Sequence, residues 1–211
     1  MELTQHHRET LAELINIGYG RAAASFSDLI GQRIALEAPK VDIHTIERVK
    51  SALQDMLKGP ISSVHQVFSG SVSGHALLLL NTETADTLTC LLVKDDVSPE
   101  QRRSLRREAL TEVGNIILQA AMGICGTLLK VHVSFSVPSL HVESIDEVLT
   151  SIVVHEQELQ FALLVRTRFQ LSRSEVSGYL VVILGVTSFS RLLDELEKWE
   201  RRQLTGDVTE P

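Results

Sequence analysis

The chain has 211 residues, of which 44% are hydrophobic and 22% charged, the composition of a globular protein with one large domain or two small ones. Lys and Arg number 20 against 27 Asp and Glu, so the formal net charge is −7. Nucleic acids and anionic membranes are bound through clustered positive charge, and the aromatic content of 4% leaves few side chains for base stacking. We therefore expect a protein or small-molecule partner, with no nucleic acid and no membrane.

Three features predict a cytoplasmic location. Cys90 and Cys125 lie in apolar helical patterns, which predicts buried thiols in a reducing compartment. The first residues, MELTQHHRETLAEL, are charged and amphipathic, unlike a signal peptide. The longest apolar stretch, residues 116–129, contains Gln119 and is shorter than the roughly 20 residues that span a bilayer.

Hydrophobic periodicity and turn residues predict similar elements in the two halves of the chain. In the first half we expect a long helix at 4–29, a strand at 33–43, a short helix at 45–57, strands at 64–69 and 72–80, and a helix at 82–93. In the second half we expect a long helix at 99–128, a strand at 131–137, a hairpin at 161–169 and 176–184, a helix at 188–201, and a disordered tail at 203–211.

The chain is self-similar. Sliding it by 99 positions lays residues 9–50 on residues 108–149 without a gap, and ten of the 42 pairs are identical, where about two or three are expected by chance. VSGHALLLL (residues 72–80) then lies on VSGYLVVIL (residues 176–184) at an offset of 104. We predict two internal repeats, at about 1–95 and 98–202, folded into a single domain.

The predicted fold is α/β of the α+β type. A duplicated α-β-β-β-α unit with approximate two-fold symmetry forms one β-sheet, with two long helices on one face. Because each half covers the surface that the other leaves exposed, we expect a monomer.

Both predicted long helices carry the same polar stripe, with spacings of four, three and four residues that bring its members to one helix face. In the first helix the stripe is Glu9, Glu13, Asn16 and Gly20. In the second it is Glu108, Glu112, Asn115 and Gln119. A single Glu-x-x-Asn is typical of a solvated face. Its recurrence favours a function, because a solvated face is free to change and Asn is a poor helix former.

An Asn side chain carries a donor and an acceptor on one planar group, so it can orient a water molecule toward an electrophile. It is not a general base at neutral pH and is a weak nucleophile. A Glu one turn earlier can pair with a cation of a partner protein. The pair is therefore suited to completing the active site of another protein.

The segments ELINIGYGRAAASFS (residues 13–27) and EVGNIILQAA (residues 112–121), each with a proline 22 residues beyond its Asn, resemble the two signatures of the CheC, CheX and FliY family. Members of this family are phosphatases of the chemotaxis response regulator CheY. The resemblance covers nearly the whole chain, and two complete signatures are the CheC arrangement. Glu9 and Glu108 stand where the family pattern has Asp or Ser, a departure expected to alter which regulator docks.

The resemblance implies that the chain hydrolyses the aspartyl phosphate of a CheY-like regulator, with Asn orienting the water and Glu pairing with the regulator's lysine. The catalytic residues so implied are Glu13, Asn16, Glu112 and Asn115. The residues expected to contact the partner are Glu9, Glu108, Gly20 and Gln119. Pro39 and Pro138 are expected to shape the strand beside each long helix. The chain needs no metal or cofactor of its own, because the regulator holds Mg²⁺.

Other motifs carry less weight. GYGRAA (residues 18–23) matches a dinucleotide-binding fingerprint, but it lies within a predicted helix, so its small residues are expected to allow close helix packing. GSVSG (residues 70–74) has Val72 where a nucleophile elbow has Ser. The histidines lack the i, i+4 spacing of metal ligands, and His75 is expected to pack rather than react.

Two alternatives to the phosphatase remain. The chain could be a non-enzymatic partner of a CheD-type receptor deamidase or of the phosphorylated regulator. It could also be a structural repeat with solvated Glu-Asn faces.

Overall fold

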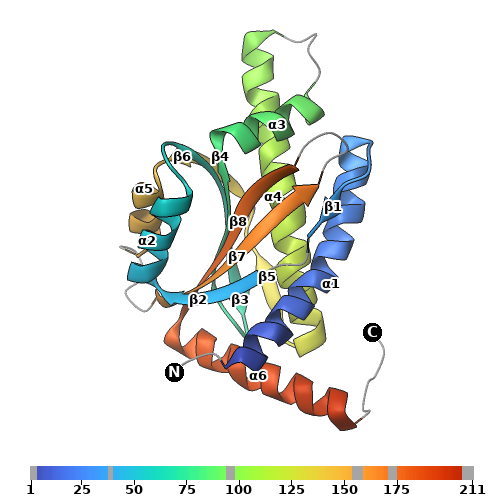
Figure 1. Ribbon diagram of the computed structural model, residues 1–211, viewed down its shortest axis with the longest axis vertical. Helices are drawn as coiled ribbons and strands as arrows, with labels where there is room; N and C mark the ends of the chain where they lie inside the picture. Colours follow the sequence, from blue (N-terminus) through green and yellow to red (C-terminus); the bar gives the residue numbers. More distant parts are fainter. Residues whose placement is uncertain (1–3, 38–39, 94–97, 154–158, 171–174, 206–211) are drawn as a thin grey trace.

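The computed structural model describes residues 4–37, 40–93, 98–153, 159–170 and 175–205. Its helices are α1 (Gln5–Ile30), α2 (Ile46–Met56), α3 (Thr82–Leu92), α4 (Pro99–Leu129), α5 (Ile145–Val153) and α6 (Val186–Thr205). Its strands are β1 (Ala35–Leu36), β2 (Lys40–Thr45), β3 (Ile61–Gly70), β4 (Gly74–Asn81), β5 (Val133–Phe135), β6 (Ser139–Glu143), β7 (Leu159–Gln170) and β8 (Glu175–Gly185). The sheet lies between two layers of helices (Figure 1).

The described strands form one antiparallel sheet of eight in the order β1-β7-β8-β4-β3-β5, with β2 paired to β7 and β6 paired to β3. In the central pair, β4 and β8, Leu77 lies opposite Val181. These are two residues that the offset of 104 aligns. The element order α-β-β-α-β-β-α occurs twice along the chain, and the sheet is laid out symmetrically about its central pair.

Alternation along the central strands builds a core on each face of the sheet. Leu78 and Leu180 join the core beneath α1, α3, α4 and α6, while Leu77 and Val181 join the core beneath α2 and α5. Each such buried side chain stabilises the fold by about 2 kcal/mol. In Figure 1, α2 and α5 lie on the opposite side of the strands from α1 and α4.

The predicted α/β class and the two long helices on one face of the sheet are confirmed, but the α-β-β-β-α unit is too simple. The strand predicted at 33–43 is two strands, β1 and β2, and Pro39 lies outside the described residues. In the second half, Pro138 separates β5 from β6, because proline has no N–H to donate to a ladder. β6 and α5 were not predicted.

The two long helices begin and end alike. The side chain of Thr4 caps α1 by accepting a backbone N–H bond, and Ser98 and Gln101 form a reciprocal capping box at the start of α4. Each helix ends at a residue in the left-handed conformation, Gly31 with φ 74° and Lys130 with φ 58°. The lysine shows that the cap geometry recurs without glycine.

Helices α1 and α4 approach each other closely at Gly18. A β-carbon built there lies 2.4 Å from the carbonyl oxygen of Ala120 and 2.8 Å from Cγ2 of Ile124. The predicted close helix packing is confirmed at this position. Two residues further on, a β-carbon at Gly20 has nothing within 4 Å, so packing does not require that glycine.

We expect Gly18→Ala to lower the free energy of unfolding by about 1–3 kcal/mol, because the added methyl group forces the two helices apart. Gly20→Ala is the matched control in the same helix, and it should be neutral or raise stability by up to about 1 kcal/mol. Urea denaturation of both variants measures the difference. Equal midpoints for the two variants would contradict the close approach.

Helix α4 is long and apolar enough, by length and composition, to cross a membrane within Glu100–Leu129. Half of its apolar window is buried inside the fold, where α4 packs on α1 and on the sheet. A helix in a protein core can be equally long and apolar, so packing explains the apolar character of α4.

Helix α6 extends to Thr205, so the prediction of a disordered tail is wrong for residues 203–205. Residues 206–211 lie outside the described residues. Glu200 in α6 accepts a hydrogen bond from the hydroxyl of Thr10 at 2.7 Å and lies 3.3 Å from Nε2 of His6. These contacts join the last helix to the start of the first.

A pair of histidines stacks on adjacent strands of the sheet. The rings of His65 and His75 lie 5.0 Å apart at 17°, and Nε2 of His65 is 2.8 Å from Nδ1 of His75. His75 is buried, as its predicted packing role requires. Burial first, and then the nearby His75 and His141, lower the pKa of His65 to about 4.

We expect stability to fall as the pH drops from about 6.5 to about 4. The unfolded chain binds a proton at His65 near its ordinary pKa, whereas the folded chain resists protonation until about pH 4, so acid favours unfolding. His65 is partly exposed, so the effect is on the order of 1 kcal/mol. Chemical denaturation across this range should show a shallower loss for His65→Gln and an intermediate one for His141→Gln. An unchanged slope in His65→Gln would contradict this account.

Candidate functional site

The first stripe lies on the exposed face of α1, as its spacing predicts. Its members, all exposed, are Glu9, Glu13, Asn16 and Gly20. Leu14 and Phe26 are fully buried against the sheet on the opposite face. Glu9 accepts a hydrogen bond from Nε2 of Gln5 at 2.8 Å. The side chains of Glu13 and Asn16 make no hydrogen bond or ion pair to any residue that the structure describes, so both are available to a partner.

The second stripe takes the same position on α4. Glu108, Glu112 and Gln119 are exposed, and Asn115 is half-buried. Glu108 accepts a hydrogen bond from the hydroxyl of Ser104 at 3.0 Å. Glu112, like Glu13, has no side-chain partner within the described part of the chain. The two helices thus present one equivalent carboxylate each.

The two asparagines differ in their surroundings. The side-chain oxygen of Asn115 accepts two hydrogen bonds, from Nε2 of Gln119 at 2.6 Å and from Nε2 of Gln66 at 3.2 Å. Asn16 accepts no side-chain hydrogen bond from the described residues, and glycine at position 20 stands where the second stripe has Gln119. The carboxamide of Asn115 is therefore held by hydrogen bonds, whereas that of Asn16 is exposed to solvent.

Gln66 is a site residue that the sequence analysis missed. It lies in β3 on the face beneath α4, is fully buried, and also donates to the carbonyl oxygen of Ser136 at 3.1 Å. Its own Oε1 is buried without a hydrogen-bond partner among the described residues. A glutamine on the core-facing side of an apolar strand is the signal that could have pointed to it, since a buried amide needs polar partners.

This arrangement has a defined chemical capacity. An exposed carboxylate one turn before a carboxamide can bind a cation and present an amide to a second group beside it. Among the described residues, no three His, Cys, Asp or Glu side chains gather closely enough to hold a metal ion.

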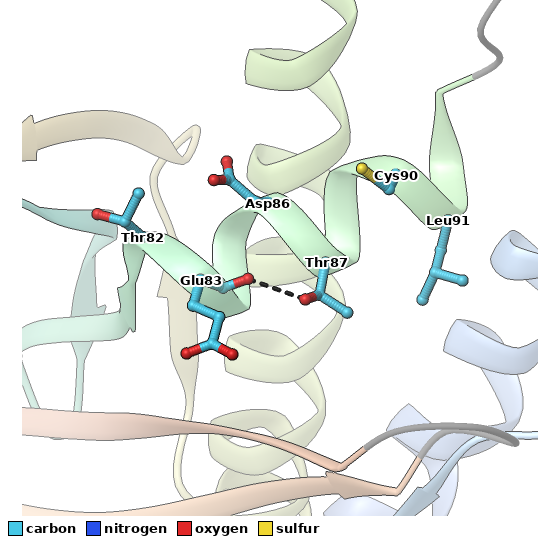
Figure 2. A pocket seen from close by; sticks show the side chains of 6 residues that line it. All are labelled: Thr82, Glu83, Asp86, Thr87, Cys90 and Leu91. Atoms are coloured by element: carbon cyan, nitrogen blue, oxygen red, sulfur yellow. Dashed lines mark hydrogen bonds between the residues drawn. The ribbon is translucent and has the colours of Figure 1, made fainter.

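A separate hollow of about 690 Å³ lies along α3 (Figure 2). Its described lining comes from that single helix: Thr82, Glu83, Asp86, Thr87, Cys90 and Leu91. The hydroxyl of Thr87 donates to the backbone oxygen of Glu83 at 2.9 Å, and no polar side chains converge on a common point (Figure 2). The hollow is not part of the Glu-Asn stripes.

The prediction of two buried thiols is half right. Cys90 is exposed on α3, beside the exposed Leu91 and just after the buried Leu88 and Thr89. Cys125 is buried in α4, and burial raises the pKa of its thiol to about 12.

Comparison with known proteins now places the chain. No protein-family model matches it. It is 21% identical over 199 residues to the CheY-P phosphatase CheC of Bacillus subtilis strain 168, a match that covers 90% of this chain and 93% of CheC. It is 20% identical over 192 residues to the flagellar motor switch phosphatase FliY of the same organism, of which the chain spans about half the length, 49%. The chain is homologous to CheC and FliY.

The fold agrees with this relationship. The crystal structure of Thermotoga maritima FliY superposes with a TM-score of 0.75 at 20% identity, covering 94% of this chain and all of that chain. The resemblance to the CheC, CheX and FliY family, which rested on the two signature segments, is thereby confirmed at low identity over most of the chain.

Proposed function

We propose that this chain dephosphorylates a CheY-like response regulator in chemotaxis or two-component signalling. The observation that carries the proposal is the exposed Glu-x-x-Asn stripe, present on both long helices of a chain homologous to a CheY-P phosphatase. The catalytic residues are Glu13, Asn16, Glu112 and Asn115.

The two glutamates dock the regulator. Glu13 and Glu112 are exposed and make no ion pair within the described residues, so neither has to break an existing contact to bind a lysine of the regulator. Exclusion of water at the interface strengthens such a pair and fixes the register of the two proteins. The neighbouring partner contacts are Glu9, Glu108, Gly20 and Gln119.

The two asparagines orient the attacking water. A carboxamide beside the phosphorylated aspartate of the regulator holds a water in line with the phosphorus atom, as a glutamine does in GTP hydrolysis. An acyl phosphate is already labile, so positioning alone is sufficient, and each 1.4 kcal/mol removed from the barrier accelerates hydrolysis about tenfold.

The regulator contributes the remaining parts of the site. It carries the aspartyl phosphate and the Mg²⁺ that neutralises the phosphoryl charge, so this chain binds no metal or cofactor of its own. We infer further that the two halves are internal repeats that give one cytoplasmic monomer two copies of the site.

Phosphate release from a purified, phosphorylated CheY-like regulator tests the proposal. The wild-type chain at equimolar concentration should shorten the lifetime of the phosphorylated regulator. A lifetime identical to that of the regulator alone would refute the phosphatase. If the chain nevertheless binds the phosphorylated regulator or a CheD-type deamidase, the non-enzymatic alternative takes its place.

A further inference from the structure

The two sites of the proposed phosphatase are not equivalent in this structure. A carboxamide that orients a water uses its oxygen to accept a hydrogen bond from the water and its nitrogen to donate one. Asn16 has both groups exposed to solvent. Asn115 has both lone pairs of Oδ1 filled by the amides of Gln119 and Gln66.

We infer that Gln119 is a positioning residue that restrains Asn115 and makes the second site the slower of the two. This inference rests on the proposed function. With Gln119 bound at 2.6 Å and Gln66 at 3.2 Å, Asn115 can donate to a phosphoryl oxygen or a water but cannot accept a hydrogen bond from a water. The Gln119 bond has to open before Asn115 does what Asn16 does unaided.

Gln119 and Gly20, the last members of the two stripes, make the two sites different. Gln119 stands one turn after Asn115, where its amide reaches the asparagine, and Gly20 stands one turn after Asn16. A β-carbon at Gly20 meets nothing within 4 Å, so a side chain could be accommodated there. The first site is therefore open because position 20 supplies no amide, and because Asn16 accepts no bond like the one from Gln66 within the described residues.

Gln66 has the opposite effect. It is buried in β3 and binds only one lone pair of Asn115, so it fixes the carboxamide and leaves the other lone pair for water once Gln119 releases it. Its second bond, to the carbonyl oxygen of Ser136, anchors it to the loop after β5. Gln66 thus prepares Asn115 for the reaction, and Gln119 blocks it.

The test isolates the second site by placing every variant in the Asn16→Ala background. Adding Gln119→Ala should raise kcat for phosphate release about two- to tenfold, the worth of one net hydrogen bond, whatever the change in KM from the lost partner contact. Gln54→Ala is the matched control: Gln54 is an exposed helical glutamine that donates to Asp146 on the opposite face of the sheet, and its loss should change nothing.

Gln66→Met separates positioning from stability. Methionine fills a similar space; it removes the buried oxygen that lacks a partner together with the two bonds that Gln66 donates, so thermal stability should change little. In the Asn16→Ala background the rate should nevertheless fall. An Asn16→Ala/Gln119→Ala chain no faster than Asn16→Ala, while the wild-type chain is active, overturns the inference and leaves the proposed function intact.

A second readout does not depend on activity. Side-chain amide NMR of the free protein should show that the Gln119 amide is hydrogen-bonded and that this signature is lost in Asn115→Ala, with the Gln54 amide unaffected. If the wild-type chain does not accelerate dephosphorylation, the proposed function fails. The NMR result then decides the restraint alone, and a Gln119 amide unchanged in Asn115→Ala overturns it.

Discussion

The Asn16→Ala/Asn115→Ala double variant should reduce the acceleration of dephosphorylation about a hundredfold, leaving the regulator to decay at close to its own rate. Both positions that orient the attacking water are then empty, and misplacement of a reacting group by about 1 Å costs on this scale. Each single variant should lose part of the activity, with Asn16→Ala losing more, because Asn115 is restrained by Gln119. Phosphate release from the phosphorylated regulator measures all three.

Binding distinguishes this loss from a docking defect. Because Asn16 is exposed and Asn115 is half-buried, alanine at these positions should leave the fold and the affinity for the regulator nearly unchanged. Asp55→Ala, at an exposed position on α2 across the sheet, is the control for a surface substitution. A double variant that dephosphorylates the regulator as fast as the wild-type chain would rule out the assigned roles.

Reversing the charge of both glutamates, in Glu13→Lys/Glu112→Lys, should weaken binding of the regulator at least tenfold. Each change replaces attraction to the regulator's lysine by repulsion, and juxtaposed like charges at an interface cost several kcal/mol. The remaining attraction should also lose its salt dependence between low and moderate ionic strength. Calorimetric titration of the chain with the regulator at two salt concentrations measures the affinity and its salt dependence.

The matched control keeps the same change in total charge. Asp55→Lys/Asp194→Lys also takes the formal net charge from −7 to −3, at two exposed positions away from the stripes. Its affinity should stay near that of the wild-type chain. Equal weakening in both double variants would mean that overall charge, and not Glu13 and Glu112, attracts the regulator.

The sequence predicted the exposure of the stripes, because helical spacing alone determines it. A period of 3.6 residues places Glu13 and Asn16 on one face, and the opposite face must be buried, so their exposure followed from the apolar pattern. Cys90 was misplaced because apolar residues surround it on both sides in sequence, and the pattern of a short helix did not show which face turns outward.

The inequality of the two sites could not be predicted. It depends on the bond from Gln119 on the same helix, and on Gln66, which is 49 residues from Asn115 and reaches it only because β3 lies beneath α4 in the folded sheet. The second half also contains β6 and α5, which were not predicted, although α5 is as amphipathic as the predicted helix α2. The contact of Gln66 with Asn115 joins distant elements, and spacing along the chain does not record it.

Turnover is the most direct test of the central claim. The chain is mixed with a twentyfold or larger excess of phosphorylated CheY-like regulator, and phosphate release is followed until the regulator alone has lost a small fraction of its phosphate. A phosphatase releases many phosphates per chain, so we expect release well beyond two per chain, the number of Glu-Asn stripes. Release that stops at two per chain, or that matches the regulator alone, would contradict a catalytic role.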